Sequence, residues 1–156
     1  MKINALILCL ALLTLQAEAY GAETATQILE TDESILKERV CLQAKKATSK
    51  RIPSFEEAFS AIELNVYGSL GKGEEHAVFE EICILSKFGH PVWQIYLSRM
   101  FYDGREWLEK DSTLAYKFYE MVCNNTCLLE ETYDLDPFAQ DHLTYLQEIF
   151  KNFWNV

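Results

Sequence analysis

From Thr31 onward, the spacing of apolar residues along this chain is helical. Ile35, Leu36, Val40 and Ala44 recur at three- and four-residue steps, the spacing that lines one face of an α-helix. No segment alternates apolar and polar residues over the length of a strand. The sequence therefore predicts an all-α fold.

Few glycines and prolines interrupt this pattern, and their positions predict about six helices. Ser54 and Glu57 form a capping box, in which the serine side chain bonds a first-turn amide and the glutamate reaches back. The first three predicted helices run from Thr31 or Asp32 to the break at Pro53, from Ser54 to Gly71 and Gly73, and over about 74–88 before Gly89. The last three run from Pro91 to Asp103–Gly104, from Asp111 or Ser112 to Asn124–Asn125, and from Asp136–Pro137 through Phe153.

The first 19 residues have the layout of a secretory signal peptide. Lys2 precedes the apolar run Ala5–Leu15, and Ala17-Glu18-Ala19 supplies a small-x-small cleavage site before Tyr20. A bilayer span needs about 20 apolar residues, more than this run or any later stretch provides. We therefore expect an exported protein, periplasmic or secreted, with one domain over residues 20–156.

A short motif recurs about every 40 residues, in the order apolar, x, Glu, x, β-branched, Cys. It occurs at Leu36–Cys41, Val78–Cys83 and Phe118–Cys123. A period of this length is typical of stacked two-helix repeats. Residues 91–125 match one such unit best. There, the first helix begins at Trp93 and ends in an aromatic residue and Gly104. An acidic loop with Asp111 follows, and the second helix contains Ala115-Tyr-Lys-Phe118-Tyr119.

This unit resembles a Sel1-like repeat, a family related to the tetratricopeptide repeats. The resemblance implies a short right-handed α-solenoid of stacked helix pairs that acts as a binding scaffold rather than an enzyme. The sequence departs from the family pattern at Trp93, where alanine is usual, and at Glu106, which replaces a loop glycine.

Removal of the leader would leave four cysteines, an even number in an oxidising compartment. Two disulfides with three possible connectivities are then expected, and buried free thiols are the alternative. Equivalent positions on stacked repeat units favour Cys41 with Cys83, and Cys123 with Cys127. No second close cysteine pair or histidine pair accompanies Cys123 and Cys127, so no metal site is predicted.

The charge of the chain restricts its partners. It carries 14 Lys and Arg against 24 Asp and Glu, a formal net charge of −10, while 49% of its residues are apolar. Such a globular, acidic protein is not expected to bind nucleic acid, because the phosphate backbone would be repelled. A protein partner is expected to be basic, with association that slows as salt rises.

No catalytic constellation or cofactor motif is found in the sequence. Ser34-Ile-Leu-Lys37 has the Ser-x-x-Lys spacing of penicillin-recognising enzymes, but their other motifs do not follow. The histidines are expected at the surface or at helix ends, and the paired carboxylates on solvated faces: His76, His90, His142, Glu74–Glu75 and Glu80–Glu81.

Aromatic and arginine side chains are concentrated between residues 93 and 107. Trp, Tyr and Arg are enriched in binding hot spots. Trp93, Leu97 and Met100 share one helical stripe that is predicted to be core. The candidate protein-binding residues are Tyr96, Arg99, Tyr102, Arg105 and Trp107. In the alternatives, these aromatics simply fill a small core, or the acidic segment Leu128–Asp136 forms the interface.

We therefore predict an exported protein-binding helical repeat. A concrete version is a periplasmic immunity or inhibitor protein that neutralises a delivered toxin or hydrolase. The alternatives are a periplasmic adaptor for envelope or secretion machinery, and a cell-wall-acting or β-lactam-binding enzyme of the kind proposed for cysteine-rich Sel1-like proteins.

Overall fold

The computed structural model describes residues 20–48, 51–126 and 137–151. The predicted signal peptide, Cys127 and the acidic segment Leu128–Asp136 lie outside these residues. Within them the chain is helical, and its one β-type pairing is the isolated bridge between Arg105 and Leu108. The prediction of an all-α chain is confirmed for this part of the sequence.

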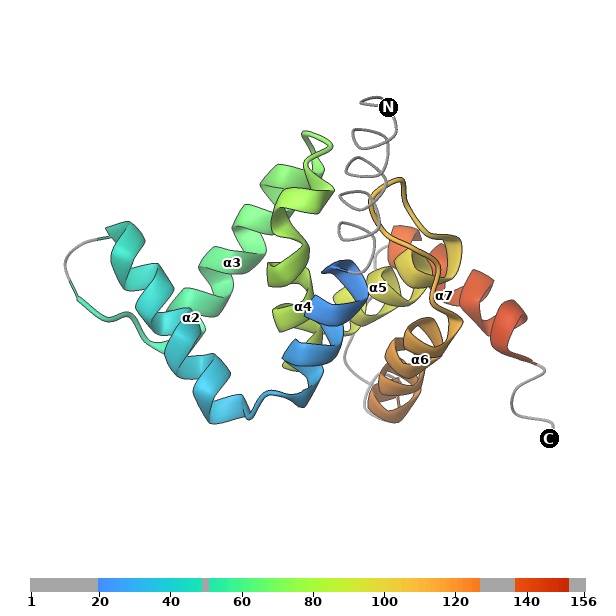
Figure 1. Ribbon diagram of the computed structural model, residues 1–156, viewed down its shortest axis with the longest axis horizontal. Coiled ribbons are helices and arrows are strands. Elements are labelled where there is room, and N and C mark those ends of the chain that lie inside the picture. Colours follow the sequence, from blue (N-terminus) through green and yellow to red (C-terminus); the bar gives the residue numbers. More distant parts are fainter. Residues whose placement is uncertain (1–19, 49–50, 127–136, 152–156) are drawn as a thin grey trace, which may run out of the picture.

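The order of the helices along the chain can be followed in Figure 1. After a helical segment at residues 20–30, they are α2 (Glu33–Thr48), α3 (Phe55–Leu70), the 3₁₀ turn η1 (Glu75–Val78), α4 (Phe79–Lys87), α5 (Pro91–Asp103), α6 (Ser112–Thr126) and α7 (Pro137–Phe150).

The predicted starts of α2, α3 and α6 are confirmed by hydrogen bonds. The Asp32 side chain accepts from the Ser34 amide at 2.8 Å, and the Asp111 side chain accepts from the Leu114 amide at 2.9 Å. In the capping box, the Glu57 amide donates to Ser54 Oγ at 3.2 Å and the Ser54 amide donates to the Glu57 carboxylate at 2.9 Å. These bonds satisfy first-turn amides that have no partner within their own helix.

Two elements differ from the sequence-based expectation. Residues 20–30 form a helix ahead of the predicted start at Thr31, with Ala25 and Ile28 buried. The predicted helix over 74–88 begins as the tighter turn η1 and becomes α-helical only at Phe79. In η1, Glu75 bonds Arg105 and the His76 ring stacks on Trp107, so this turn is anchored to the loop that follows α5.

The helices pack mainly on their neighbours in sequence. α2 contacts α3, α3 contacts α4, α4 contacts α5 and α5 contacts α6, whereas α7 also lies against α5. Figure 1 shows α2 and α3 at one end of the molecule, and α6 and α7 at the other. α5 lies between them and buries Trp93, Leu97 and Met100, so the predicted core stripe is confirmed. Stacking as a right-handed Sel1-like solenoid stays a prediction.

None of the described helices is long and apolar enough to cross a bilayer.

Candidate functional site

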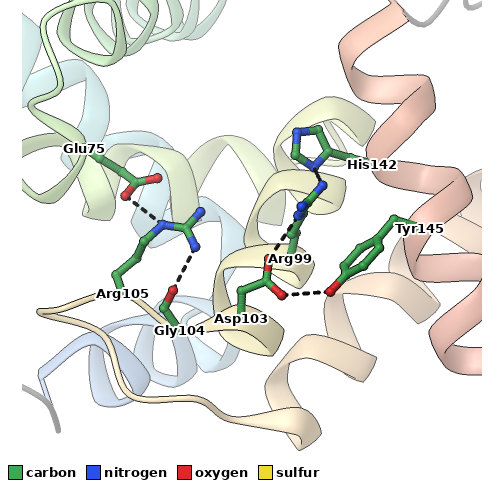
Figure 2. Close-up of polar contacts among 7 residues, drawn as sticks. All are labelled: Glu75, Arg99, Asp103, Gly104, Arg105, His142 and Tyr145. Carbon is green, nitrogen blue, oxygen red and sulfur yellow. Dashed lines mark hydrogen bonds and ion pairs between the residues drawn. The ribbon is translucent and has the colours of Figure 1, made fainter.

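Arg99 is the centre of a polar network that joins α5 to α7 (Figure 2). Its Nε donates to Asp103 at 3.0 Å and its Nη1 donates to Nδ1 of His142 at 2.7 Å. The guanidinium also lies 4.3 Å from the ring centroid of Tyr145, whose hydroxyl donates to Asp103 at 3.0 Å. The predicted binding residue Arg99 is thus half-buried and holds α7 in place.

Tyr96 and Tyr102, the other two candidates on α5, also contact the rest of the chain. The Tyr96 hydroxyl donates to the Glu75 carboxylate, and burial followed by this bond raises the pKa of Tyr96. Tyr102 packs edge-on against Tyr145 and Phe150, with ring centroids 6.3 and 6.0 Å apart. Both side chains are half-buried.

Arg105 and Trp107 lie in the loop after α5 and face η1. Arg105 Nε donates to Glu75 at 3.1 Å, and its Nη1 donates to the Gly104 carbonyl at 2.8 Å (Figure 2). Trp107 stacks on His76 with ring centroids 4.6 Å apart. Glu75, for which a solvated position is expected from the sequence, has a side chain only 17% exposed. Binding of a partner by these five residues remains a prediction.

The position of His142 makes the docking of α7 sensitive to pH. Its Nδ1 accepts from Arg99 and therefore carries no proton. Burial, and then the positive charge of Arg99 with a smaller contribution from Arg105, lower the pKa of His142, while Asp103 and Asp141 oppose this shift. Because the folded pKa is below the unfolded value of about 6.5, the network is fully stabilising above about pH 6.5 and weakens as the pH falls.

We therefore expect the amides of α7 to lose hydrogen-exchange protection between about pH 7.5 and pH 5.5, after correction for intrinsic exchange. His142→Gln supplies a neutral acceptor that does not titrate in this range. The variant should show little pH dependence of protection in α7. Equal pH dependence in wild type and variant would contradict this role of His142.

The two side chains of the Ser-x-x-Lys pair have different partners in the structure. Ser34 is exposed and bonds Asp32, whereas the Lys37 Nζ lies 5.2 and 5.8 Å from the ring centroids of Phe55 and Phe88. In the described part of the chain, no cluster of three His, Cys, Asp or Glu side chains could hold a metal ion.

The cysteines predicted to form a disulfide, Cys41 and Cys83, are both thiols in the structure. Cys41 is half-buried on α2, and Cys83 is buried on α4, where desolvation raises the pKa of its thiol. Cys123 lies beside the Tyr119 hydroxyl, and burial together with this contact raises the pKa of Tyr119 to about 12. The structure does not show the Cys41–Cys83 disulfide, and Cys127 lies outside the described residues, so the pairing stays a prediction.

A groove between α2, α3 and α4 is a second candidate site, and no sequence motif indicates it. Its volume is about 190 Å³, far above the roughly 10–15 Å³ that holds one water. We call it the hairpin groove, and it is lined by Val40, Gln43, Ala44, Ala58, Ala61, Ile62, Asn65 and Glu81. Alanines on both facing helices keep the groove open, because their side chains are too short to fill it.

Glu81 is the charged group of this groove. Its side chain is half-buried, and desolvation raises the pKa of its carboxyl, with a further contribution from the neighbouring charge of Glu80. The sequence indicates only a solvated pair at Glu80–Glu81, since helical spacing does not show which neighbouring helix meets each face.

No family model, no curated protein and no solved structure matches this chain.

Proposed function

We propose that the chain is an exported protein-binding helical module whose binding surface is the α2–α3 hairpin, residues 33–70. The observation that carries this proposal is the distribution of exposed apolar side chains. Among the described residues, five of the seven large exposed hydrophobic side chains belong to this hairpin: Ile35, Leu42, Ile52, Leu64 and Tyr67.

Three of these side chains lie in or near two hollows of the hairpin. Ile35 and Leu42 line a shallow depression on the surface of α2. Leu64, which is 73% exposed, lies three residues from Ala61 and so one helical turn from the edge of the hairpin groove. Exposed apolar surface beside a hollow is typical of protein–protein contact sites. The arginines at 99 and 105, in contrast, already bind carboxylates of the chain.

In its most concrete form, the proposal is a periplasmic immunity or inhibitor protein with a basic partner. The net charge of −10 favours such a partner by long-range attraction. A neighbouring gene for a secreted toxin would support this form, whereas a secretion or transpeptidase locus would support an adaptor. Covalent labelling of the purified protein by a β-lactam would instead support an enzyme.

The proposal is tested by capture of the neighbouring gene product, or of a periplasmic binding partner, with single hairpin variants. Ile35→Ser and Leu64→Ser should each weaken binding roughly thirtyfold, the effect of losing about 2 kcal/mol at a hot spot. Both side chains are exposed, so the thermal melts should stay close to wild type.

Tyr20→Ser is the matched control, since Tyr20 is 50% exposed and lies outside the hairpin. It should bind the partner as wild type does. Normal binding by both hairpin variants, with loss only in Tyr96 or Arg99 variants that still fold, would place the interface on α5 and refute the proposed surface.

A further inference from the structure

Glu81 differs from the other half-buried carboxylates of the hairpin region. Glu80 pairs with Arg39 at 2.8 Å, and Glu63 lies 2.6 Å from His90. Among the described residues, no Lys, Arg or His forms an ion pair with Glu81. Burial removes part of the hydration of this carboxylate, and a hydrogen bond from its own backbone amide replaces only part of it, so a cation beside Glu81 would be favourable.

The residues around the Glu81 carboxylate form walls that suit the aliphatic part of a long side chain. Val40, Ala58, Ala61 and Ile62 supply apolar surface, and Gln43 and Asn65 supply neutral amides. Lysine and arginine have the matching shape, because their apolar stems pack along such walls while the charged end finds a partner. The hairpin groove therefore combines apolar walls with one negative charge.

We propose that the hairpin groove binds a lysine or arginine side chain of a partner protein, with the cation on Glu81 and the aliphatic stem between α2 and α3. This inference rests on the proposed function, and it identifies the partner chemistry that the groove selects. Charge complementarity argues for this occupant over the chain's own segment 127–136, whose repeated Asp and Glu would be repelled by Glu81.

Affinity selection with a display library of random dodecapeptides tests the proposal. On the wild-type protein, the selected peptides should be enriched in lysine or arginine flanked by aliphatic residues. When the best peptide is synthesised with norleucine in place of its lysine, its affinity for the wild-type protein should fall about tenfold.

Glu81→Gln keeps the size of the side chain and removes its charge, so it should fold at least as well as wild type. It should bind the lysine and norleucine peptides equally. Glu120→Gln makes the same charge change at an exposed position of α6 and should preserve the preference for lysine. Ala61→Trp fills the groove from an exposed position and should abolish peptide binding, whereas Ser60→Trp on the same helix should not.

Selection that yields no peptide, or no enrichment of basic residues, would overturn the inference, as would an unchanged lysine preference in Glu81→Gln. This failure is distinct from failure of the proposed function. If the hairpin variants lose the captured partner while Glu81→Gln retains it, the hairpin is the binding surface and the lysine site is wrong. If partner capture is independent of the hairpin but peptide selection requires Glu81, the lysine site stands and the proposed function fails.

Discussion

Replacing Phe101 by alanine is expected to lower the free energy of unfolding by about 3–5 kcal/mol. Phe101 is fully buried on α5. Its ring centroid lies 5.9 Å from that of Phe118 on α6 and 6.1 Å from that of Phe79 on α4. The substitution therefore leaves a cavity where three helices meet. Since domains of this size are stable by about 5–15 kcal/mol, the loss would be a large part of the total stability.

Urea unfolding followed by circular dichroism measures this effect. Leu64→Ala is the matched control, because it truncates a large apolar side chain that is 73% exposed. Its free energy of unfolding should stay within about 0.5 kcal/mol of wild type. A loss of less than about 1 kcal/mol in Phe101→Ala would mean that α5 is not the centre of the core.

The sequence predicts helix ends well because their chemistry is local. The Ser54–Glu57 box involves residues three positions apart, and Asp111 caps α6 with the same spacing. Gly104 directly after α5, and Gly89 two residues after the last residue of α4, adopt positive φ, as expected of glycines that end helices. Such interactions are formed between neighbours in sequence, so one sequence is enough to predict them.

Interactions between helices could not be predicted in the same way. Arg99 meets His142 across 43 positions, and Arg105 meets Glu75 across 30. Helical spacing shows that Tyr96 and Arg99 share a stripe next to the core stripe, but not which element will cover that stripe. The half-buried state of these side chains therefore appears only once η1 and α7 are placed.

The hairpin groove could not be predicted from the sequence, for a related reason. Alanine is common in helices of every kind, so Ala44, Ala58 and Ala61 give no signal until α2 and α3 face each other. Glu81 belongs to an ordinary acidic pair in the sequence, and only its packing beside the groove makes it half-buried. The helix at residues 20–30 could have been predicted from the sequence, because Ala22, Ala25, Ile28 and Leu29 repeat with helical spacing.

Replacing Gly104 by alanine is expected to have the second large effect, because Gly104 ends α5 in a conformation that only glycine adopts readily. Its φ of 75° and ψ of 174° lie in a region that costs other residues about 1–3 kcal/mol. An added Cβ would also lie 3.2 Å from the Leu108 carbonyl oxygen and 2.9 Å from Lys110 Cγ. The lysine can move aside, but the Leu108 backbone is held by its paired hydrogen bonds with Arg105.

The loss should therefore reach the upper part of that range, about 2–3 kcal/mol in urea unfolding, and should loosen the loop that carries Arg105 and Trp107. Gly68→Ala is the opposite control: Gly68 is an exposed residue within α3, with nothing within 4 Å of an added Cβ. It should raise stability by up to about 1 kcal/mol through helix propensity. If Gly104→Ala unfolds like wild type, the turn after α5 tolerates a side chain. The fixed placement of Arg105 against Glu75 would then need a cause other than the backbone of Gly104.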